Sequence, residues 1–229
     1  MHRRLLHAAL ALLAAPALAG AGTCGIIYDT SQLQLVIDPV DVVDVESDAG
    51  ALEVYAFERT GVVVSYHLVG FDASLKEVDY AVDGDRLDVF MLKAGPAEVT
   101  ADFYLETPLA TDLELRVDDG PVKLTGLSGS ISGTVGVGDV EGVHLLAPDL
   151  DLEVTRGAVT LEFLARPTSV RVTADAGDVT LRLPAGAYRC DLDAEAEPVL
   201  KDITCDDAAD AELVLAAPAG EIHLEGTAP

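Results

Sequence analysis

The sequence of 229 residues predicts an all-β protein built as a β-solenoid, with stacked coils of about 20 residues and two or more short strands per coil. Three observations predict this class. A Gly-x-Val-x-Leu motif recurs in the second half of the chain, its copies are 18 to 23 residues apart, and apolar and polar residues alternate between them. Alternation at period two is the pattern of a strand with one buried face, and no stretch after residue 21 shows helical periodicity.

The copies of the motif keep the same order of glycine, valine or isoleucine, and leucine. Four complete copies begin at Gly120, Gly157, Gly177 and Gly220. A fifth, Gly138-Asp139-Val140, has Gly142 in the place of leucine, and a degenerate sixth, Glu197-Pro198-Val199, has lost its glycine. The steps between the six are 18, 19, 20, 20 and 23 residues, which is the period of a solenoid coil.

Each period contains two expected strands joined by a glycine turn. Residues 149–154 read Asp-Leu-Asp-Leu-Glu-Val, a turn follows at Gly157, and residues 159–164 form the second strand. Glycine supplies the positive φ that sharp turns need, and aspartate caps turns through its own side chain. An antiparallel sandwich also has short strands and glycine turns, but the regular period, the constant phase and the small aliphatic core residues favour the solenoid.

Residues 35–110 depart from this regularity. Segments around Gly50 and Gly84 look like the same unit, but these glycines are 34 residues apart, and 36 residues separate Gly84 from Gly120. Each interval therefore predicts about two coils. Nine of the 11 Phe and Tyr residues precede position 110, so we expect a broader end here that caps the stack and protects its open edge.

Residues 1–21 have the layout of a secretory signal. A basic start, Met1-His2-Arg3-Arg4, precedes an apolar stretch to Leu18, and small residues suited to cleavage follow up to Ala21. The alternative is a membrane anchor, but the stretch is shorter than the roughly 20 apolar residues that cross a bilayer. We expect export to the periplasm or the cell surface of a bacterium, and no transmembrane helix in the mature chain. The expected organisation is a signal peptide in residues 1–21, an N-terminal segment in 22–34 and a single solenoid domain in 35–226, with its regular repeats in 111–226.

The chain is strongly acidic, with 40 Asp and Glu against 14 Lys and Arg and a formal net charge of −26. Removing the signal takes away Arg3 and Arg4 and leaves −28. Nucleic acid needs a basic footprint, so it is excluded as a partner, and the same argument disfavours direct docking on anionic lipid. We interpret the excess of negative charge as that of a well-solvated surface.

Three cysteines remain in the mature chain. Cys190 and Cys205 are the natural disulfide pair in an oxidising compartment, worth about 3 kcal/mol by the loop-entropy argument. Cys24 follows the signal closely, where a bacterial lipoprotein carries its lipid anchor, although the preceding Ala21-Gly22-Thr23 is a poor lipoprotein signal. A pairing elsewhere and a free thiol are the alternatives for Cys24.

No motif in the sequence points to catalysis or to a bound cofactor. His67, His144 and His223 are each isolated from other residues at metal-ligand spacing. Residues 129–133 resemble a nucleophile elbow, but Ile131 stands at the centre in place of serine. The Gly-Val-Gly of residues 136–138 is not followed by a helix, which excludes a dinucleotide loop. We therefore predict no catalytic residue, no cofactor and no metal site.

The acidic turns raise the question whether the protein binds calcium. Stacking of the coils would align Asp119, Asp139 and Asp178 along one edge. Calcium-binding β-rolls, however, have a nine-residue period, whereas the period here is about 20 residues. A solvated edge is the preferred interpretation, and calcium binding is the alternative.

Several segments resemble bacterial families labelled putative adhesins, whose domains of unknown function carry Gly-Asp-Val repeats. The most similar segments are Phe103–Pro108, Leu113–Gly120, Val135–Val140 and Ala174–Val179. The resemblance covers about residues 35–226 and implies a right-handed β-solenoid, the hand that parallel crossovers generally take. The coil around Glu197 departs from the family pattern because it lacks the glycine, and we interpret the cysteine pair in that coil as a cross-link that offsets a weak repeat.

The sequence thus predicts a non-catalytic envelope or surface protein, an adhesin-like scaffold or binding module whose partner is an envelope protein or a glycan. End-to-end self-association through the ends of the stack is a further expectation. The alternative is a carbohydrate-active β-helix enzyme, in which carboxylates cluster in one groove beside aromatic platforms. The mature chain has no Trp and only 12 Lys and Arg, and its acidity would repel an acidic polysaccharide.

Overall fold

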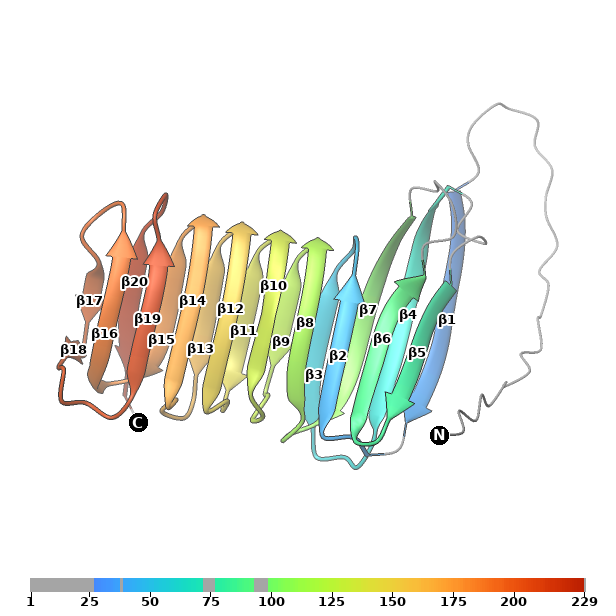
Figure 1. Cartoon of the computed structure of the whole chain (residues 1–229), viewed down its shortest axis with the longest axis horizontal. Coiled ribbons are helices and arrows are strands. Elements are labelled where there is room, and N and C mark those ends of the chain that lie inside the picture. The colour runs from blue at the N-terminus through green and yellow to red at the C-terminus, as the bar shows by residue number, and fades with distance from the viewer. Residues whose placement is uncertain (1–26, 38, 72–76, 93–98, 229) are drawn as a thin grey trace.

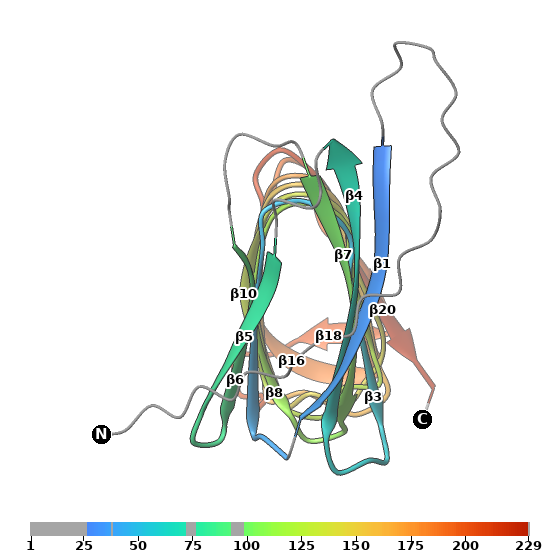
Figure 2. The same cartoon turned by 90° about the vertical axis from the view of Figure 1, so that its right-hand side faces the viewer.

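The computed structural model describes residues 27–37, 39–71, 77–92 and 99–228, which form two ten-stranded sheets that lie face to face (Figure 1 and Figure 2). In spatial order, sheet A contains β1 (Ile27–Ile37), β4 (Val62–Phe71), β7 (Val99–Pro108), β3 (Leu52–Phe57), β9 (Val122–Thr125), β11 (Val140–Leu145), β13 (Val159–Phe163), β15 (Val179–Pro184), β20 (Ile222–Thr227) and β17 (Val199–Lys201). Sheet B contains β18 (Ile203–Cys205), β16 (Gly186–Ala194), β19 (Glu212–Ala217), β14 (Ser169–Ala176), β12 (Asp149–Arg156), β10 (Ile131–Val137), β8 (Asp112–Asp119), β2 (Val42–Ser47), β6 (Arg86–Leu92) and β5 (Glu77–Asp83). The predicted all-β class is confirmed.

From β8 to β17 the chain alternates between the two sheets. We call a strand of sheet B together with the next strand of sheet A a unit, so β8–β9, β10–β11, β12–β13 and β14–β15 are four consecutive units. Each strand pairs in parallel with the equivalent strand of the next unit, as in the register Leu113↔Ile131↔Leu150↔Val170 across sheet B. Parallel pairing of this kind is not that of an antiparallel sandwich.

The core lies between the sheets and is built by the alternation seen in the sequence. In β12, for example, Leu150, Leu152 and Val154 are buried and the residues between them are exposed. The buried residues form one cluster that extends along the stack, and most of its members are Val and Leu. Burial of each such side chain stabilises the fold by about 1.5–3 kcal/mol before the entropic cost of ordering the chain.

Six glycines stack on one another where the chain passes from sheet B to sheet A, and we call them the glycine ladder. The ladder consists of Gly50, Gly120, Gly138, Gly157, Gly177 and Gly220. A Cβ atom on any of the last five would lie 1.9–2.1 Å from the carbonyl oxygen of the glycine before it. Four of the six have φ between +119° and +153°, whereas Gly177 and Gly220 lie outside that region. Close approach between units, rather than positive φ alone, is therefore what the recurring glycine provides.

The copy of the motif that lacks leucine is completed by a residue further along the chain. The pairing of β11 with β13 shifts between Gly142 and Leu145, which marks a bulge. A Cβ at Gly142 would lie 2.8 Å from Cδ1 of Leu145, so the Leu145 side chain fills the space of the missing leucine. His144 takes φ of 56° at this bulge.

At the first end of the stack, the expected spacing of about two coils from Gly50 to Gly84 and about two more from Gly84 to Gly120 is wrong. β2 pairs directly with β8, β3 pairs directly with β9, and the two glycines are neighbours in the ladder. β6 and β7 lie on the other side of β2 and β3, so the chain leaves the stack, builds its outer end and returns. Gly84 belongs to the turn of the antiparallel β5–β6 hairpin and not to a coil.

The outer end also contains strands that run against the others. β4 pairs antiparallel with both β1 and β7, and β1 begins at Ile27, so strand structure starts before residue 35. The expected signal in residues 1–21 and Cys24 lie outside the described residues. No helix among the described residues is long and apolar enough to cross a membrane.

The second end shows the same departure from chain order. β19 and β20 pair with β14 and β15, and the degenerate unit that contains Glu197 is displaced to the outside of the stack. Gly220 therefore stacks on Gly177. The unit that has lost the motif glycine thus lies outermost, next to the unit of Gly220.

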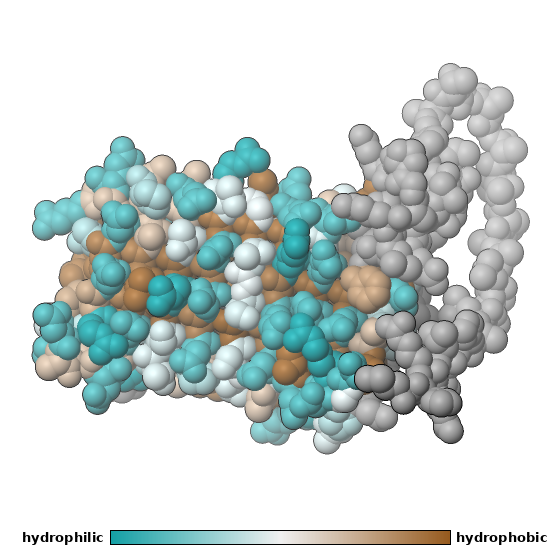
Figure 3. Space-filling view, in the orientation of Figure 1, coloured by the Kyte–Doolittle hydropathy of each residue, from teal (hydrophilic) through white to brown (hydrophobic). Residues whose placement is uncertain are grey.

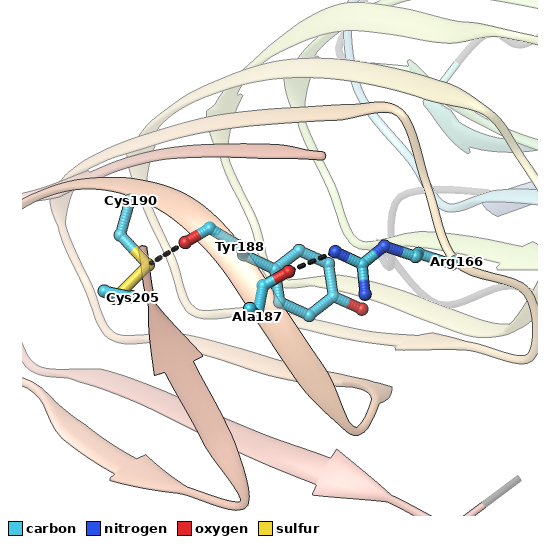
Figure 4. The surroundings of a disulfide bond; sticks show 5 residues. All are labelled: Arg166, Ala187, Tyr188, Cys190 and Cys205. Atoms are coloured by element: carbon cyan, nitrogen blue, oxygen red, sulfur yellow. Dashed lines mark hydrogen bonds between the residues drawn. A yellow bond between two sulfur atoms is a disulfide. The ribbon is translucent and has the colours of Figure 1, made fainter. Parts of the chain in front are cut away.

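A disulfide and a buried tyrosine hold this outer unit (Figure 4). Cys190 of β16 is bonded to Cys205 of β18, the pair expected from the sequence. Tyr188 is fully buried, and its hydroxyl donates a 2.7 Å hydrogen bond to the carbonyl of Pro184. The Arg166 guanidinium lies 4.2 Å from the centre of the Tyr188 ring, a cation–π contact, and burial raises the pKa of this tyrosine.

Candidate functional site

The outer face of sheet A carries three adjacent aromatic rings, which we call the aromatic patch. Tyr55 and Phe57 come from β3 and Tyr104 from the neighbouring β7. The ring centres of Tyr55 and Tyr104 are 5.0 Å apart, and those of Tyr55 and Phe57 are 6.5 Å apart. Phe57 is 45% exposed and Tyr104 38% exposed, so the patch presents apolar ring surface to solvent.

Strand alternation and register explain how these residues meet. Leu52 and Val54 of β3 point into the core, which turns Glu53 and Tyr55 outward. The parallel register of β3 with β7 then places Glu53 opposite Tyr104. Residues facing each other on adjacent strands have Cβ atoms about 5 Å apart, so the carboxylate and the ring are lateral neighbours.

Carboxylates surround the patch and fix its rings. The Tyr55 hydroxyl donates a 2.7 Å hydrogen bond to Oε2 of Glu53. This bond, together with partial burial and the negative charge of Glu53, raises the pKa of Tyr55 to about 12. Burial, and then the charges of Glu106 and Glu53, raise the pKa of Tyr104. Glu106 is paired with Arg59.

Two shallow depressions of about 220 Å³ each lie on either side of Glu53 and share Ala51. The first is lined further by Ser65, Tyr66, His67, Asp102, Phe103 and Tyr104. The second is lined further by Leu52, Pro121, Val122, Lys123, Asp139 and Glu141. Glu53 and the Tyr104 ring thus stand at the centre of a surface that crosses β4, β7, β3, β9 and β11.

The outer face of sheet B is different in character. On the part of this face that Figure 3 shows in colour, hydrophilic side chains are spread out with apolar surface between them. Its acidic depression, lined by Asp44, Asp88 and others, contains Arg86, whose guanidinium bonds Asp44, Asp88 and Glu114 on three adjacent strands. The guanidinium lowers the pKa of Glu114, and the three carboxylates raise the pKa of Arg86. The Arg86 guanidinium therefore offsets part of the negative charge of these three carboxylates.

The expected row of Asp119, Asp139 and Asp178 does not form. Asp119 precedes its ladder glycine and is in register with Val137, whereas Asp139 and Asp178 follow theirs. The Asp139 carboxylate accepts a 2.8 Å bond from the amide of Ala158, and the Asp178 carboxylate accepts a 2.9 Å bond from the amide of Glu221. These aspartates join one unit to the next, which gives the Gly-Asp step of the motif a structural role.

The three histidines lie on different strands: His67 on β4, His144 on β11 and His223 on β20. His223 bonds the carboxylate of Glu221 at 2.9 Å on the exposed face. In the described part of the chain, no three His, Cys, Asp or Glu side chains are grouped so that they could hold a metal ion.

Sequence reasoning missed the aromatic patch. The concentration of Phe and Tyr before position 110 was visible, and it was interpreted as a cap. Alternation alone places Glu53, Tyr55 and Phe57 on one face, but the contribution of Tyr104 depends on the pairing of β3 with β7. That pairing joins a unit to one formed later in the chain, which no local pattern reveals.

No family model and no curated protein matches the sequence. Solved structures with a similar chain path include a putative cell adhesion protein from Clostridium sporogenes, which is 12% identical with a TM-score of 0.48 over 88% of this chain and 100% of that one. A putative adhesin from Bacteroides fragilis is 14% identical with a TM-score of 0.46, over 87% of this chain and 96% of that one. A putative lipid binding protein from Parabacteroides distasonis is 12% identical with a TM-score of 0.33, over 87% and 97%. Likenesses at this level carry no argument about function.

Proposed function

We propose that this protein is an exported, non-catalytic binding module of the bacterial envelope, adhesin-like in kind, and that the aromatic patch is its binding surface. One observation carries the proposal: the rings of Tyr55, Phe57 and Tyr104 lie next to one another on the outer face of sheet A, and those of Phe57 and Tyr104 are exposed to solvent. Aromatic side chains combine a large apolar contact area with few rotatable bonds, and clusters of them on a surface mark interaction sites. The partner is an envelope protein or a glycan.

Export is supported by the disulfide, because such bonds persist in oxidising compartments. The basic and apolar layout of residues 1–21 supports the same route. Within this proposal, a lipid on Cys24 would tether the module to a membrane. Metabolic labelling with an alkyne fatty acid tests the tether, and labelling that persists in a Cys24→Ser variant would exclude it.

We also infer that the units form a right-handed β-solenoid in one domain, expected over residues 35–226 and extended by β1 back to Ile27. The chain path supports this inference: it runs up β8, crosses to sheet A, descends β9 and returns to sheet B one strand further along (Figure 1). Parallel strands joined by such crossovers are right-handed in nearly all proteins. The single core cluster supports one domain.

The alternative, a carbohydrate-active enzyme, needs a proton-donating carboxyl whose pKa is raised. The pKa of Glu114 moves the other way because of Arg86, and the pKa of Glu225 is lowered by Lys201 and Arg182. These two carboxyls lie on opposite sheets, and each is neutralised by a neighbouring cation. The observations favour binding over catalysis.

Binding to isolated bacterial envelopes tests the proposal. The mature chain is labelled and its bound fraction is compared with that of a Phe57→Ser/Tyr104→Ser variant, which removes exposed rings and leaves the core intact. Phe90→Ser is the matched control, because Phe90 lines the acidic depression on sheet B. We expect the double variant to lose binding and the control to keep it. Equal binding by all three proteins would exclude the aromatic patch as the binding surface.

End-to-end self-association is a second candidate, favoured by one observation. β18 covers only the start of β16, so among the described strands none pairs with the outer edge of residues 189–194. Asp191 and Asp193 are exposed on this strand and would repel a second acidic copy. Sedimentation velocity over a range of protein concentrations measures the effect, and a constant sedimentation coefficient would eliminate this candidate.

A further inference from the structure

We infer that the aromatic patch takes a cation, the guanidinium or ammonium group of an Arg or Lys side chain on a basic segment of a partner protein. This inference rests on the proposed function, since it names the class of partner for the same surface. Three features of the surface lead to it: the ring faces, the charges that surround them, and the way the protein already holds one of its own guanidinium groups.

The rings offer π-faces to the ligand. The Tyr55 hydroxyl is engaged with Glu53, so it is not available to donate to an incoming group. The exposed faces of Tyr104 and Phe57 carry the negative end of the ring quadrupole. Such a face attracts a cation within about 6 Å of its centre.

The charges nearest the rings select the sign of the ligand. The acidic side chains that line the two depressions are Glu53, Asp102, Asp139 and Glu141, and Glu106 stands beside them on β7. The cations of this surface are Arg59, which is paired with Glu106, and Lys123; His67 lies beside Asp102 in the register of β4 with β7. The balance is negative at the patch, as it is for the whole chain at −26. A cation is attracted, an anionic partner is repelled, and a neutral glycan gains nothing from this field.

The position of Glu53 completes the site. It lies directly across from Tyr104 on the adjacent strand, so a planar guanidinium stacked on the Tyr104 ring reaches the Glu53 carboxylate at the same time. Arginine combines stacking and bidentate hydrogen bonding with the attraction between opposite charges, and a neutral sugar lacks this attraction.

Sheet B contains an internal example of the same chemistry. There Arg86 of β6 extends across β2 and bonds carboxylates of β2, β6 and β8, with distances of 2.8 Å to Asp88 and 2.9 Å to Glu114. Carboxylates on adjacent parallel strands are thus spaced to receive one guanidinium. On sheet A, the equivalent cation is the one that we assign to the partner.

Titration with fluorescein-labelled nona-arginine tests the assignment. Tyr104→Leu keeps the apolar area and the net charge but removes one π-face, and we expect binding about fivefold weaker, which corresponds to about 1 kcal/mol. Tyr104→Trp should bind more tightly, because indole is the best π-donor. Phe90→Leu on sheet B is the matched control and should leave the affinity unchanged.

A parallel titration with neutral maltohexaose distinguishes failure of the cation assignment from failure of the proposed binding surface. If Tyr104→Leu weakens the oligosaccharide and not nona-arginine, the cation assignment is overturned while the binding surface stands. If Tyr104→Leu alters neither ligand, both the assignment and the proposed surface are overturned. If nona-arginine binds all variants equally, its binding reflects general acidity, which also overturns the assignment.

Discussion

Replacing Gly157 by alanine tests the idea that the units approach one another too closely for any side chain. The new Cβ would lie 2.1 Å from the carbonyl oxygen of Gly138 and 2.5 Å from its carbon. Non-bonded carbon and oxygen atoms need more than 3 Å, so the strands must separate by about 1 Å or the turn must distort.

The size of the effect follows from two contributions. Overpacking of a closely packed region costs about 1–3 kcal/mol. Gly157 also has φ of 144°, a conformation that costs an alanine about 1–3 kcal/mol. We therefore expect the free energy of unfolding to fall by about 4 kcal/mol, a large part of the roughly 5–15 kcal/mol that stabilises a typical domain.

Equilibrium denaturation in urea, followed by far-ultraviolet circular dichroism, measures this loss. Two matched variants separate the contributions. Gly84→Ala has φ of 68° but no atom within 4 Å of the new Cβ, so it reports conformational strain of about 1–2 kcal/mol. Gly177→Ala lies outside the left-handed region but would meet the Gly157 oxygen at 1.9 Å, so it reports the clash. If Gly157→Ala costs no more than Gly84→Ala, the close-approach reasoning is refuted.

Three further predictions concern the outer unit, the acidic cluster and the patch. Reduction of the disulfide should remove about 3 kcal/mol from the outer unit, so that limited proteolysis cuts within β16–β18 while β8–β15 stay protected; unchanged resistance would contradict the cross-linking role. Arg86→Gln should destabilise the protein by about 1 kcal/mol at pH 7, because it removes the cation that lowers the pKa of Glu114. A carboxyl whose pKa is lowered in the folded state stabilises the protein above its ordinary pKa of 4.5, and this stabilisation is lost as the pH falls through the lowered pKa. The free energies of unfolding of variant and wild type should therefore converge as the pH falls below 4.5; a constant gap would argue against the ion pair. Glu53→Gln should lower the pKa of Tyr55 from about 12 toward 10.0 in a carbon-13 tyrosine NMR titration, and an unchanged value would contradict the Tyr55–Glu53 hydrogen bond.

The regular part of the fold was predictable because it depends on local patterns. Alternation along residues 149–154 identifies a strand with one buried face, and the glycine steps locate the turns. The cysteine pair was predictable from its short separation and the expected compartment. The role of the recurring glycine is only partly predictable from the sequence. Gly157 has the expected positive φ, whereas at Gly177 glycine is required by the close approach of a neighbouring carbonyl.

The order of units in space could not be read from chain spacing. The distance from Gly50 to Gly120 suggests intervening coils, but the two glycines are in contact because the chain between them folds outward and returns. The degenerate motif at Glu197 likewise lies at the outside of the stack, although it precedes Gly220 in the chain. The number of residues between two motifs gives the length of the chain that connects them. It does not tell whether the two strands are neighbours in the sheet.

By itself, then, the sequence determined the strand class, the inward and outward faces, the acidic character and the position of the cross-link, since each depends on residues close together in the chain. Only the tertiary structure decided which strands are neighbours, and with them the meeting of Tyr104 with Glu53 and Tyr55 and the use of Asp139 as a link between units. The physical reason is that side chains on one face of a sheet are brought together by strand pairing, and parallel pairing joins segments that are distant in sequence.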